Sequence, residues 1–419
     1  MEKKNLINKD NNIDNNIDND INNNNKINNS SKKTILESII NRSLKCSNQT
    51  IEITSNLMQS IISKDKNKLI ELCSNGLPDD LPILRSLIWK IIFDYLPINS
   101  EEWTNVLNTQ RKLYEFYKEQ FLIRLNKEFK LLENFNNKSL KEKKELEEKT
   151  NKLLLEEIKK DMNRTHTQLS FFFQPTNNKN KLSPDKIKTM IENKRNCTMT
   201  DLNDTYNKNI IETNADVVSR ILFIYAKFSP DINYVQGMNE IISPIYYCYS
   251  FDKLYFENDC NVEADTFWTF YYLMDKIKYV FIREEDNSKR GVLGKTKKLK
   301  ELVKIVDKDI YNHFMKYQLD FSLFAFRWFI LFFSQDFLMI DILRLWDFLF
   351  CEENKFKNTF YISLAIMLMK KDSLLDSDLP AMIEELQRLD VIDVEMLIIN
   401  AKRIKERFGE ECEEILKNV

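Results

Sequence analysis

The chain has 419 residues, more than one compact hydrophobic core usually holds, so we expect two helical lobes or one domain with tails and insertions. Its formal net charge is only -2 at pH 7, which argues against a nucleic-acid binder that works by neutralising phosphates. Five glycines and eight prolines are too few for a turn-rich β architecture. The composition therefore favours an all-α fold.

Cysteine and histidine usage excludes several kinds of site. The seven cysteines are scattered and never spaced as Cys-x-x-Cys, which indicates a reducing, cytoplasmic compartment without disulfides or a zinc cage. His166 and His313 are the only histidines, so we expect neither a histidine triad nor a metal site. The first residues lack the apolar core of a signal peptide. The most apolar region, Leu319 to Phe350, is interrupted by charges, which favours buried core over a membrane span.

The first third of the chain divides into a tail and a helical part. Residues 1–33 are rich in asparagine and cannot bury enough apolar surface to fold, so we expect a disordered tail. Residues 34–69 carry helical periodicity in two short pieces. A turn at Gly76 then leads into a short helix with acidic residues in its first turn. Arg85 and Trp89 share one face of this helix, because they are four residues apart.

The middle of the chain contains two expected insertions. Glu102 to about Phe135 has the pattern of a long helix, and the charged stretch at about 127–157 is interpreted as a solvated insertion or a helix extension. The polar stretch at about 176–212 is interpreted as a surface insertion.

Further helices are expected after the second insertion. A main helical domain covers about 70–390, and a C-terminal helix covers 391–419. The expected helices of the distal part are Glu263 to Phe281, Leu299 to Phe314, Phe321 to Phe333, Asp341 to Phe350 and Thr359 to Lys370.

The stretch Tyr-Val-Gln-Gly-Met-Asn-Glu at 234–240 stands between two helical runs. The run from Ala215 to Phe228 ends at Pro230, and a second apolar helix begins at Met238 despite Pro244. Gln236 therefore lies at a junction between a loop and a helix, where rigid elements can hold its amide against a ligand. The alternative is a buried glutamine that satisfies the helix start.

Arg164 closes an acidic and basic helix in the pattern Ile158-x-x-Asp161-x-x-Arg164-Thr165. Alone, an arginine near a helix end is usually a solvated cation that complements the helix dipole. Asp161, three residues earlier, is close enough to orient the guanidinium. An oriented arginine and a loop-mounted glutamine are the pair that GTP hydrolysis needs, because one neutralises phosphoryl charge and the other positions the attacking water.

One motif is misleading. Gly291 to Thr296 ends like a phosphate-binding loop, but the position of its first glycine holds Lys289. The charged residues before it do not predict the buried strand that such a loop follows, so we do not interpret it as a nucleotide site.

With these motifs in order, the chain resembles a TBC-domain protein, that is, a GTPase-activating protein for Rab GTPases. The resemblance covers about 70 to 370, and some details are similar to the subfamily of TBC domain family member 13. Departures are Asp336, where glutamate is usual, and the two long insertions. The motifs that carry the resemblance are Gly76-x-Pro78, Arg85-x-x-x-Trp89, the Arg164 and Gln236 motifs, Phe326-Arg327-Trp328, Ser334-Gln335-Asp336-Phe337 and Arg344-Leu345-Trp346-Asp347.

The resemblance implies a two-lobed all-α domain that binds a GTP-bound Rab-family small GTPase. Arg164 and Gln236 would be the two catalytic fingers supplied in trans, with no hydrolase activity of the chain's own. GTP and Mg²⁺ would belong to the partner, so no cofactor is expected, and membrane association would be peripheral, through the Rab at endomembranes. The alternative is a catalytically silent Rab-binding scaffold or adaptor in membrane traffic. The expected supporting residues are Asp161, Thr165, Tyr234, Gly237, Asn239, Glu240, Arg85, Trp89, Arg327, Trp346 and Asp347.

Overall fold

The computed structural model describes residues 35–123, 138–176, 212–251, 259–352, 356–389 and 391–417. Apart from one antiparallel bridge between Pro175 and Thr213, these residues form helices and their connections, which confirms the all-α prediction. The expected disordered tail, residues 1–33, lies outside the described residues. The first helices are α2 (Ile35–Ser43), α3 (Asn48–Ile62), α4 (Lys66–Ser74), α5 (Pro82–Ile92), α6 (Trp103–Lys118), α8 (Lys138–Met162), α10 (Asn214–Phe228), α11 (Met238–Ser250) and α12 (Asp259–Ile277). The later helices are α13 (Val292–Val306), α14 (Lys308–Lys316), α15 (Ser322–Leu331), α16 (Met339–Leu349), α17 (Lys357–Met369), α18 (Lys371–Leu375), α19 (Leu379–Gln387) and α20 (Val394–Leu416).

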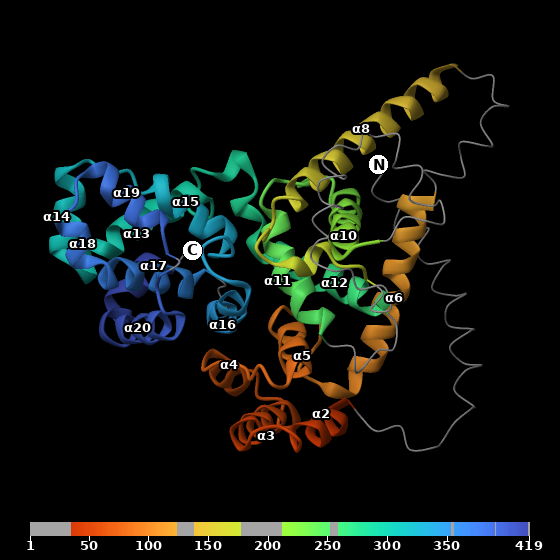
Figure 1. The fold of residues 1–419 in the computed structure, drawn as a ribbon, viewed down its shortest axis with the longest axis horizontal. Helices are drawn as coiled ribbons and strands as arrows, with labels where there is room; N and C mark the ends of the chain where they lie inside the picture. The colour runs from red at the N-terminus through yellow and green to blue at the C-terminus, as the bar shows by residue number, and fades with distance from the viewer. Residues whose placement is uncertain are drawn as a thin grey trace.

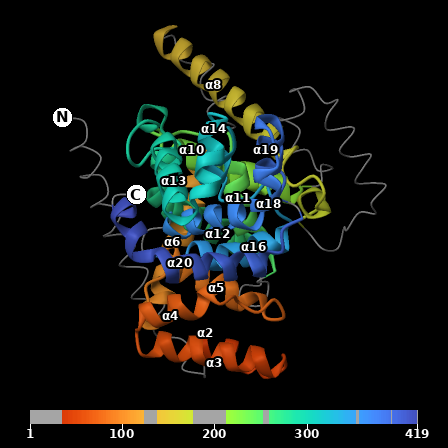
Figure 2. The same cartoon turned by 90° about the vertical axis from the view of Figure 1, so that its left-hand side faces the viewer.

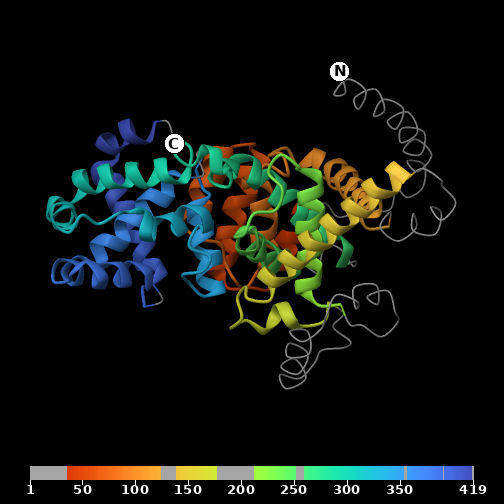
Figure 3. The same ribbon diagram turned by 90° about the horizontal axis from the view of Figure 1, so that it is seen from above.

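The helices form two lobes that stand side by side (Figure 1; Figure 3). The first lobe contains α2 to α12, and the second contains α13 to α20. Helix α11 lies where the lobes meet and packs against α5 and α12 on one side and α15 and α16 on the other. Every residue from Met238 to Tyr246 is buried, and the helix continues through Pro244 as expected. Among the described residues, no helix is both long and apolar enough to cross a lipid bilayer.

A buried ionic cluster joins the two lobes around Asp347 of α16. Its carboxylate accepts hydrogen bonds from Arg85 Nη2 at 3.0 Å, from Trp89 Nε1 at 2.9 Å and from the Leu77 amide at 3.0 Å. Trp346 donates to the Phe332 carbonyl at 3.0 Å, and its ring lies 5.9 Å from that of Trp89. The expected shared face of Arg85 and Trp89 is confirmed, since both side chains reach the same carboxylate.

Several helix boundaries differ from the sequence expectations. Residues 34–69 were expected to contain two helical pieces, but α2, α3 and α4 are three helices. The single helix expected from Leu299 to Phe314 is interrupted at Asp307, whose side chain caps α14 by accepting from the amides of Asp309 and Ile310. The acidic residues before α5 precede the helix instead of occupying its first turn, and Asp79 pairs with Arg85 at 2.6 Å.

Helix α8 includes the described part of the charged stretch expected at 127–157. It projects from the body on the side opposite α2 and α3 (Figures 1 and 2). Residues 124–137 lie outside the described part of the chain, and so does the far end of the helix expected from Glu102. The described residues 138–157 of this stretch are helical.

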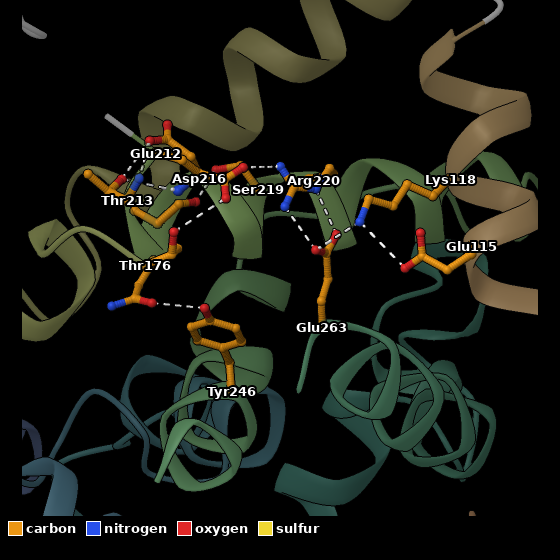
Figure 4. Close-up of polar contacts among 12 residues, drawn as sticks. Glu115, Lys118, Thr176, Glu212, Thr213, Asp216, Ser219, Arg220, Tyr246 and Glu263 are labelled. Carbon is orange, nitrogen blue, oxygen red and sulfur yellow. Dashed lines mark hydrogen bonds and ion pairs between the residues drawn. The ribbon is translucent and has the colours of Figure 1, made fainter. Parts of the chain in front are cut away.

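The described residues on either side of the second expected insertion lie next to each other in the first lobe. Residues 177–211 are not described, but Thr176 donates through its amide to the Glu212 carbonyl at 3.1 Å. Thr213 and Asp216 then form a capping box that starts α10. Arg220 holds this junction, because it pairs with Glu212 and also with Glu263 of α12 at 2.7 Å (Figure 4).

The charges around Glu263 are balanced inside the lobe. Arg220 and Lys118 pair with its carboxylate, and Tyr114 donates to it at 2.7 Å (Figure 4 shows the first two). Although burial opposes ionisation, the hydrogen bond and charge of Arg220 lower the pKa of Glu263. This network links α6, α10 and α12 within the first lobe.

Candidate functional site

Arg164 lies in the turn that follows α8. Its amide donates to the Asp161 carbonyl at 3.0 Å, and its Nη2 donates to Asp161 Oδ1 at 2.6 Å. The side chain is nevertheless 59% exposed. A carboxylate thus orients the guanidinium while most of its surface faces solvent.

Gln236 lies in the connection between α10 and α11 and is exposed. The loop is shaped by Asn233 and Gly237, which both have positive φ, 61° and 106°. Asn233 accepts the Tyr234 amide through its own side chain at 2.8 Å, and asparagine tolerates this left-handed conformation. Gly237 is the N-cap of α11, and a Cβ there would lie 2.9 Å from Leu331 Cδ2. Position 237 therefore requires glycine for its conformation and for its close approach to α15.

Tyr234 joins this loop to the Arg164 turn. Its hydroxyl donates to Asp161 Oδ2 at 2.7 Å, so Asp161 contacts both Arg164 and Tyr234. Burial, followed by the hydrogen bond to Asp161, raises the pKa of Tyr234, which keeps the hydroxyl a donor.

Asn239 makes a second connection between the same two segments. Its Nδ2 donates to Thr165 Oγ1 at 2.6 Å, and its Oδ1 accepts the Gly237 amide at 3.0 Å. Thr165 in turn donates to the Asp161 carbonyl at 2.9 Å. Asp161, Thr165 and Asn239 are all buried, so these bonds are shielded from water. The exposed arginine and the exposed glutamine are thus mounted on one shared buried network.

The expected site residues fall into three places. Arg85, Trp89, Trp346 and Asp347 form the ionic cluster between the lobes and are absent from the network below Arg164 and Gln236. Arg327 lies on the second lobe, where it pairs with Asp336 and donates to the Gln387 carbonyl at 3.0 Å. The residues gathered around the two exposed side chains are Asp161, Thr165, Tyr234, Gly237, Asn239 and Glu240.

Arg85, Asp347 and Arg327 are all hydrogen-bonded and at least partly buried. Arg85 and Asp347 are buried, whereas the side chain of Arg327 is 36% exposed. Asp336, the residue that departs from the usual glutamate, is buried beneath Arg327. The shorter side chain still reaches the guanidinium.

Two neighbours of the network were missed in the sequence. His166 is buried, and its Nε2 lies 3.5 Å from Glu240 Oε2. The side chain of Gln335 faces the Glu240 carboxyl group and favours its ionised form. Gln335 belongs to a motif already quoted for the resemblance and could have been included, whereas no sequence pattern signals the position of His166.

The segment that ends like a phosphate-binding loop has a different structure. Helix α13 begins at Val292, and a short 3₁₀ turn at Arg283–Glu285 precedes it instead of a buried strand. Lys295 is buried, with its Nζ 3.5 Å from the centre of the Phe356 ring. This lysine packs into the core, so the segment is not an open phosphate-binding loop.

Arg164 and Gln236 are both exposed at the surface of the described chain. Two surface pockets of about 400 and 590 Å³ lie elsewhere, and neither is lined by Arg164 or Gln236. In the described part of the chain, no group of three or more histidine, cysteine, aspartate or glutamate residues could hold a metal ion. An exposed arginine beside an exposed glutamine suits contact with a macromolecule.

Comparisons with known proteins identify relatives of this chain. The family model of the Rab-GTPase-TBC domain matches residues 177–375, a range that includes Gln236 and begins after Arg164. TBC1 domain family member 13 from Homo sapiens is 30% identical over 377 residues, which cover 81% of this chain and 94% of that protein. GTPase-activating protein GYP1 from Saccharomyces cerevisiae is 25% identical over 338 residues, or 76% of this chain and 42% of that protein.

The fold has a solved counterpart. The crystal structure of the Ypt/Rab-GAP domain of Gyp1p superimposes with a TM-score of 0.59 at 20% identity, covering 84% of this chain and 99% of that one. The predicted resemblance is therefore confirmed, together with its relation to member 13. This chain belongs to the Rab-GTPase-TBC domain family.

Proposed function

We propose that this chain is a GTPase-activating protein that accelerates GTP hydrolysis by a GTP-bound Rab-family small GTPase. The observation that carries the proposal is the buried network that holds exposed Arg164 and exposed Gln236 on adjoining loops. Family membership supports the partner class, and relatives such as GYP1 are named as GTPase-activating proteins.

Arg164 is proposed as the arginine finger. Its guanidinium would contact the transferring phosphoryl group and neutralise the charge that develops in the transition state. Such an arginine contributes roughly 10³–10⁵ in rate, equal to about 4–7 kcal/mol of barrier. The ion pair with Asp161 would keep the guanidinium oriented before the partner binds, which reduces the ordering cost on binding.

Gln236 is proposed as the glutamine finger. Its amide would orient the attacking water and would substitute for the glutamine that GTPases supply themselves. Gly237, which holds the loop against Leu331, fixes the place from which the side chain extends.

In this proposal the nucleotide and Mg²⁺ belong to the partner, and the chain has no resident cofactor. Because its substrate would be a Rab, the chain would act at the cytoplasmic face of endomembranes and take part in vesicle traffic. Its membrane association would be peripheral, through the Rab.

A panel of GTP-loaded Rab GTPases, assayed for phosphate release with and without the chain, tests the proposal. At least one Rab should show acceleration that Arg164→Lys abolishes, because lysine keeps the charge but lacks the planar fork. Rab binding without acceleration, by the folded wild-type chain, would instead identify a catalytically silent scaffold.

A further inference from the structure

A buried ionisable pair lies directly behind the two proposed fingers. His166 follows Arg164 by two residues, and Glu240 follows Gln236 by four. Their side chains are only 3% and 5% exposed, and His166 Nε2 lies 3.5 Å from Glu240 Oε2. Neither group has a role in the proposed phosphoryl chemistry.

The surroundings of Glu240 leave its charge poorly balanced. Asp161 and Arg164 face it from the end of α8 and the turn after it, but they are paired with each other at 2.6 Å. A neutral partner also contributes, because Asn239 Nδ2 donates to Oε1 at 3.2 Å. Burial therefore raises the pKa of Glu240 to about 7.

His166 is constrained but incompletely bonded. Its ring packs nearly parallel to Phe172, with centroids 6.0 Å apart, and its backbone has a φ of 43° that non-glycine residues rarely adopt. Nε2 has no hydrogen-bond partner within the described residues, and burial lowers the pKa of the imidazole to about 4. A buried ring nitrogen that faces a carboxyl oxygen, in a strained turn, marks a position held for a specific interaction.

We propose that His166 and Glu240 are a positioning pair that fixes the Arg164 turn relative to the start of α11 through a hydrogen bond between Nε2 and Oε2. This inference rests on the proposed function. A movement of about 0.5 Å brings the two atoms to an ordinary hydrogen-bond distance. Because His166 continues the Arg164 turn and Glu240 lies in the first turn of the helix after Gln236, the bond would make the two fingers move as one unit.

The proposed hydrogen bond can form in both protonation states of Glu240. Above a pH of about 7, the carboxylate accepts from an Nε2–H tautomer of neutral His166. Below that pH, the carboxylic acid donates its proton to Nε2 of the same neutral ring. The positioning role therefore needs a hydrogen-bonding group at each position, not a particular charge.

The test separates the hydrogen bond from packing. His166→Phe keeps a flat ring against Phe172 and removes Nε2, Glu240→Leu removes the acceptor, and Glu240→Gln keeps a group that can donate to Nε2. With the Rab that the wild-type chain activates most strongly, His166→Phe and Glu240→Leu should each lower kcat at least tenfold, while KM changes less than about threefold. Glu240→Gln should stay within about threefold of wild type.

A double variant, His166→Phe with Glu240→Leu, should be no worse than either single variant, because one bond is lost in all three. Additive losses, a wild-type kcat for His166→Phe, or equal damage by Glu240→Gln and Glu240→Leu would each overturn the pair. If His166→Phe does not fold, the comparison of Glu240→Gln with Glu240→Leu still decides the question.

A stability measurement needs no GTPase. The raised pKa of Glu240 means that the folded chain gains stability as pH falls from about 7 towards the ordinary carboxyl value and loses it as pH rises. Glu240→Gln should therefore raise Tm at pH 8 more than at pH 6, and equal shifts at both would contradict the proposed environment. If no Rab is activated but these shifts occur, the proposed function fails while the buried environment of Glu240 stands.

Discussion

Asn239 Nδ2 donates to Thr165 Oγ1 at 2.6 Å, although the two residues are 74 positions apart. Together with the hydrogen bond from Tyr234 to Asp161, this bond connects the start of α11 and the loop before it to the end of α8 and the turn after it. Two exposed side chains on different loops thereby share one support, and the predictions below probe that support and its surroundings.

Asn239→Ala should lower both stability and activity. The substitution leaves the buried Gly237 amide unsatisfied, which costs about 1–3 kcal/mol, and it also removes the donor to Thr165 Oγ1. We expect a lower Tm and at least a tenfold lower kcat at similar Rab affinity. Ser219→Ala is the matched control, since that buried hydroxyl bonds only within its own helix, to the Ala215 carbonyl at 2.7 Å. A wild-type kcat for Asn239→Ala would show that the network does not position the fingers.

Gly237→Ala should destabilise the chain by at least about 1–2 kcal/mol, because alanine is strained at a φ of 106° and its Cβ meets Leu331. The control is Gly409→Ala in α20, where no atom lies within 4 Å of the new Cβ. That change should stabilise the helix by about 0.5–1 kcal/mol. Denaturant unfolding of both variants measures the contrast, and equal effects would contradict the required conformation at 237.

Asp347→Ala should destabilise the chain by about 3–5 kcal/mol, since it leaves the buried guanidinium of Arg85 without its partner between the lobes. Activity per folded molecule should fall much less. Asp79→Ala removes the other carboxylate that pairs with Arg85. Because the side chain of Asp79 is 60% exposed, this change should cost less than about 1 kcal/mol. An Asp347→Ala chain as stable as wild type but unable to bind the GTPase would place Asp347 in the partner interface.

Replacing residues 178–210 with a short glycine-serine linker should leave Tm nearly unchanged, because the flanking residues are already held together at Thr176 and Glu212. A deletion extended through Thr213 should be clearly destabilising. It removes the capping box of α10 and one carboxylate partner of Arg220. Similar Tm values for the two deletions would refute this account of the junction.

The sequence was most informative where one local signal decided the structure. Pro230 and Gly237 bracket the loop that carries Gln236, and the helices on either side lie where periodicity placed them. Local apolar periodicity failed at Asp307, because the apolar pattern continues through a residue that caps a new helix.

Long-range partners could not be predicted in the same way. Nothing in the motif spacing says that Tyr234 reaches Asp161, 73 residues away, or that Arg85 meets Asp347. His166 was missed because its position depends on a positive φ in a turn, which no residue pattern near it indicates. These contacts depend on how the helices pack against each other. Sequence periodicity predicts only which face of each helix is buried.

The most direct test uses a Rab whose own switch glutamine is replaced by alanine. Single-turnover GTP hydrolysis by this Rab is measured with the wild-type chain and with Gln236→Ala, alongside a binding assay. The account predicts substantial acceleration by the wild-type chain, nearly complete loss with Gln236→Ala, and unchanged binding, because water positioning acts at the transition state. Failure of the wild-type chain to accelerate this Rab, while it still accelerates the unaltered one, would contradict a water-positioning role for Gln236.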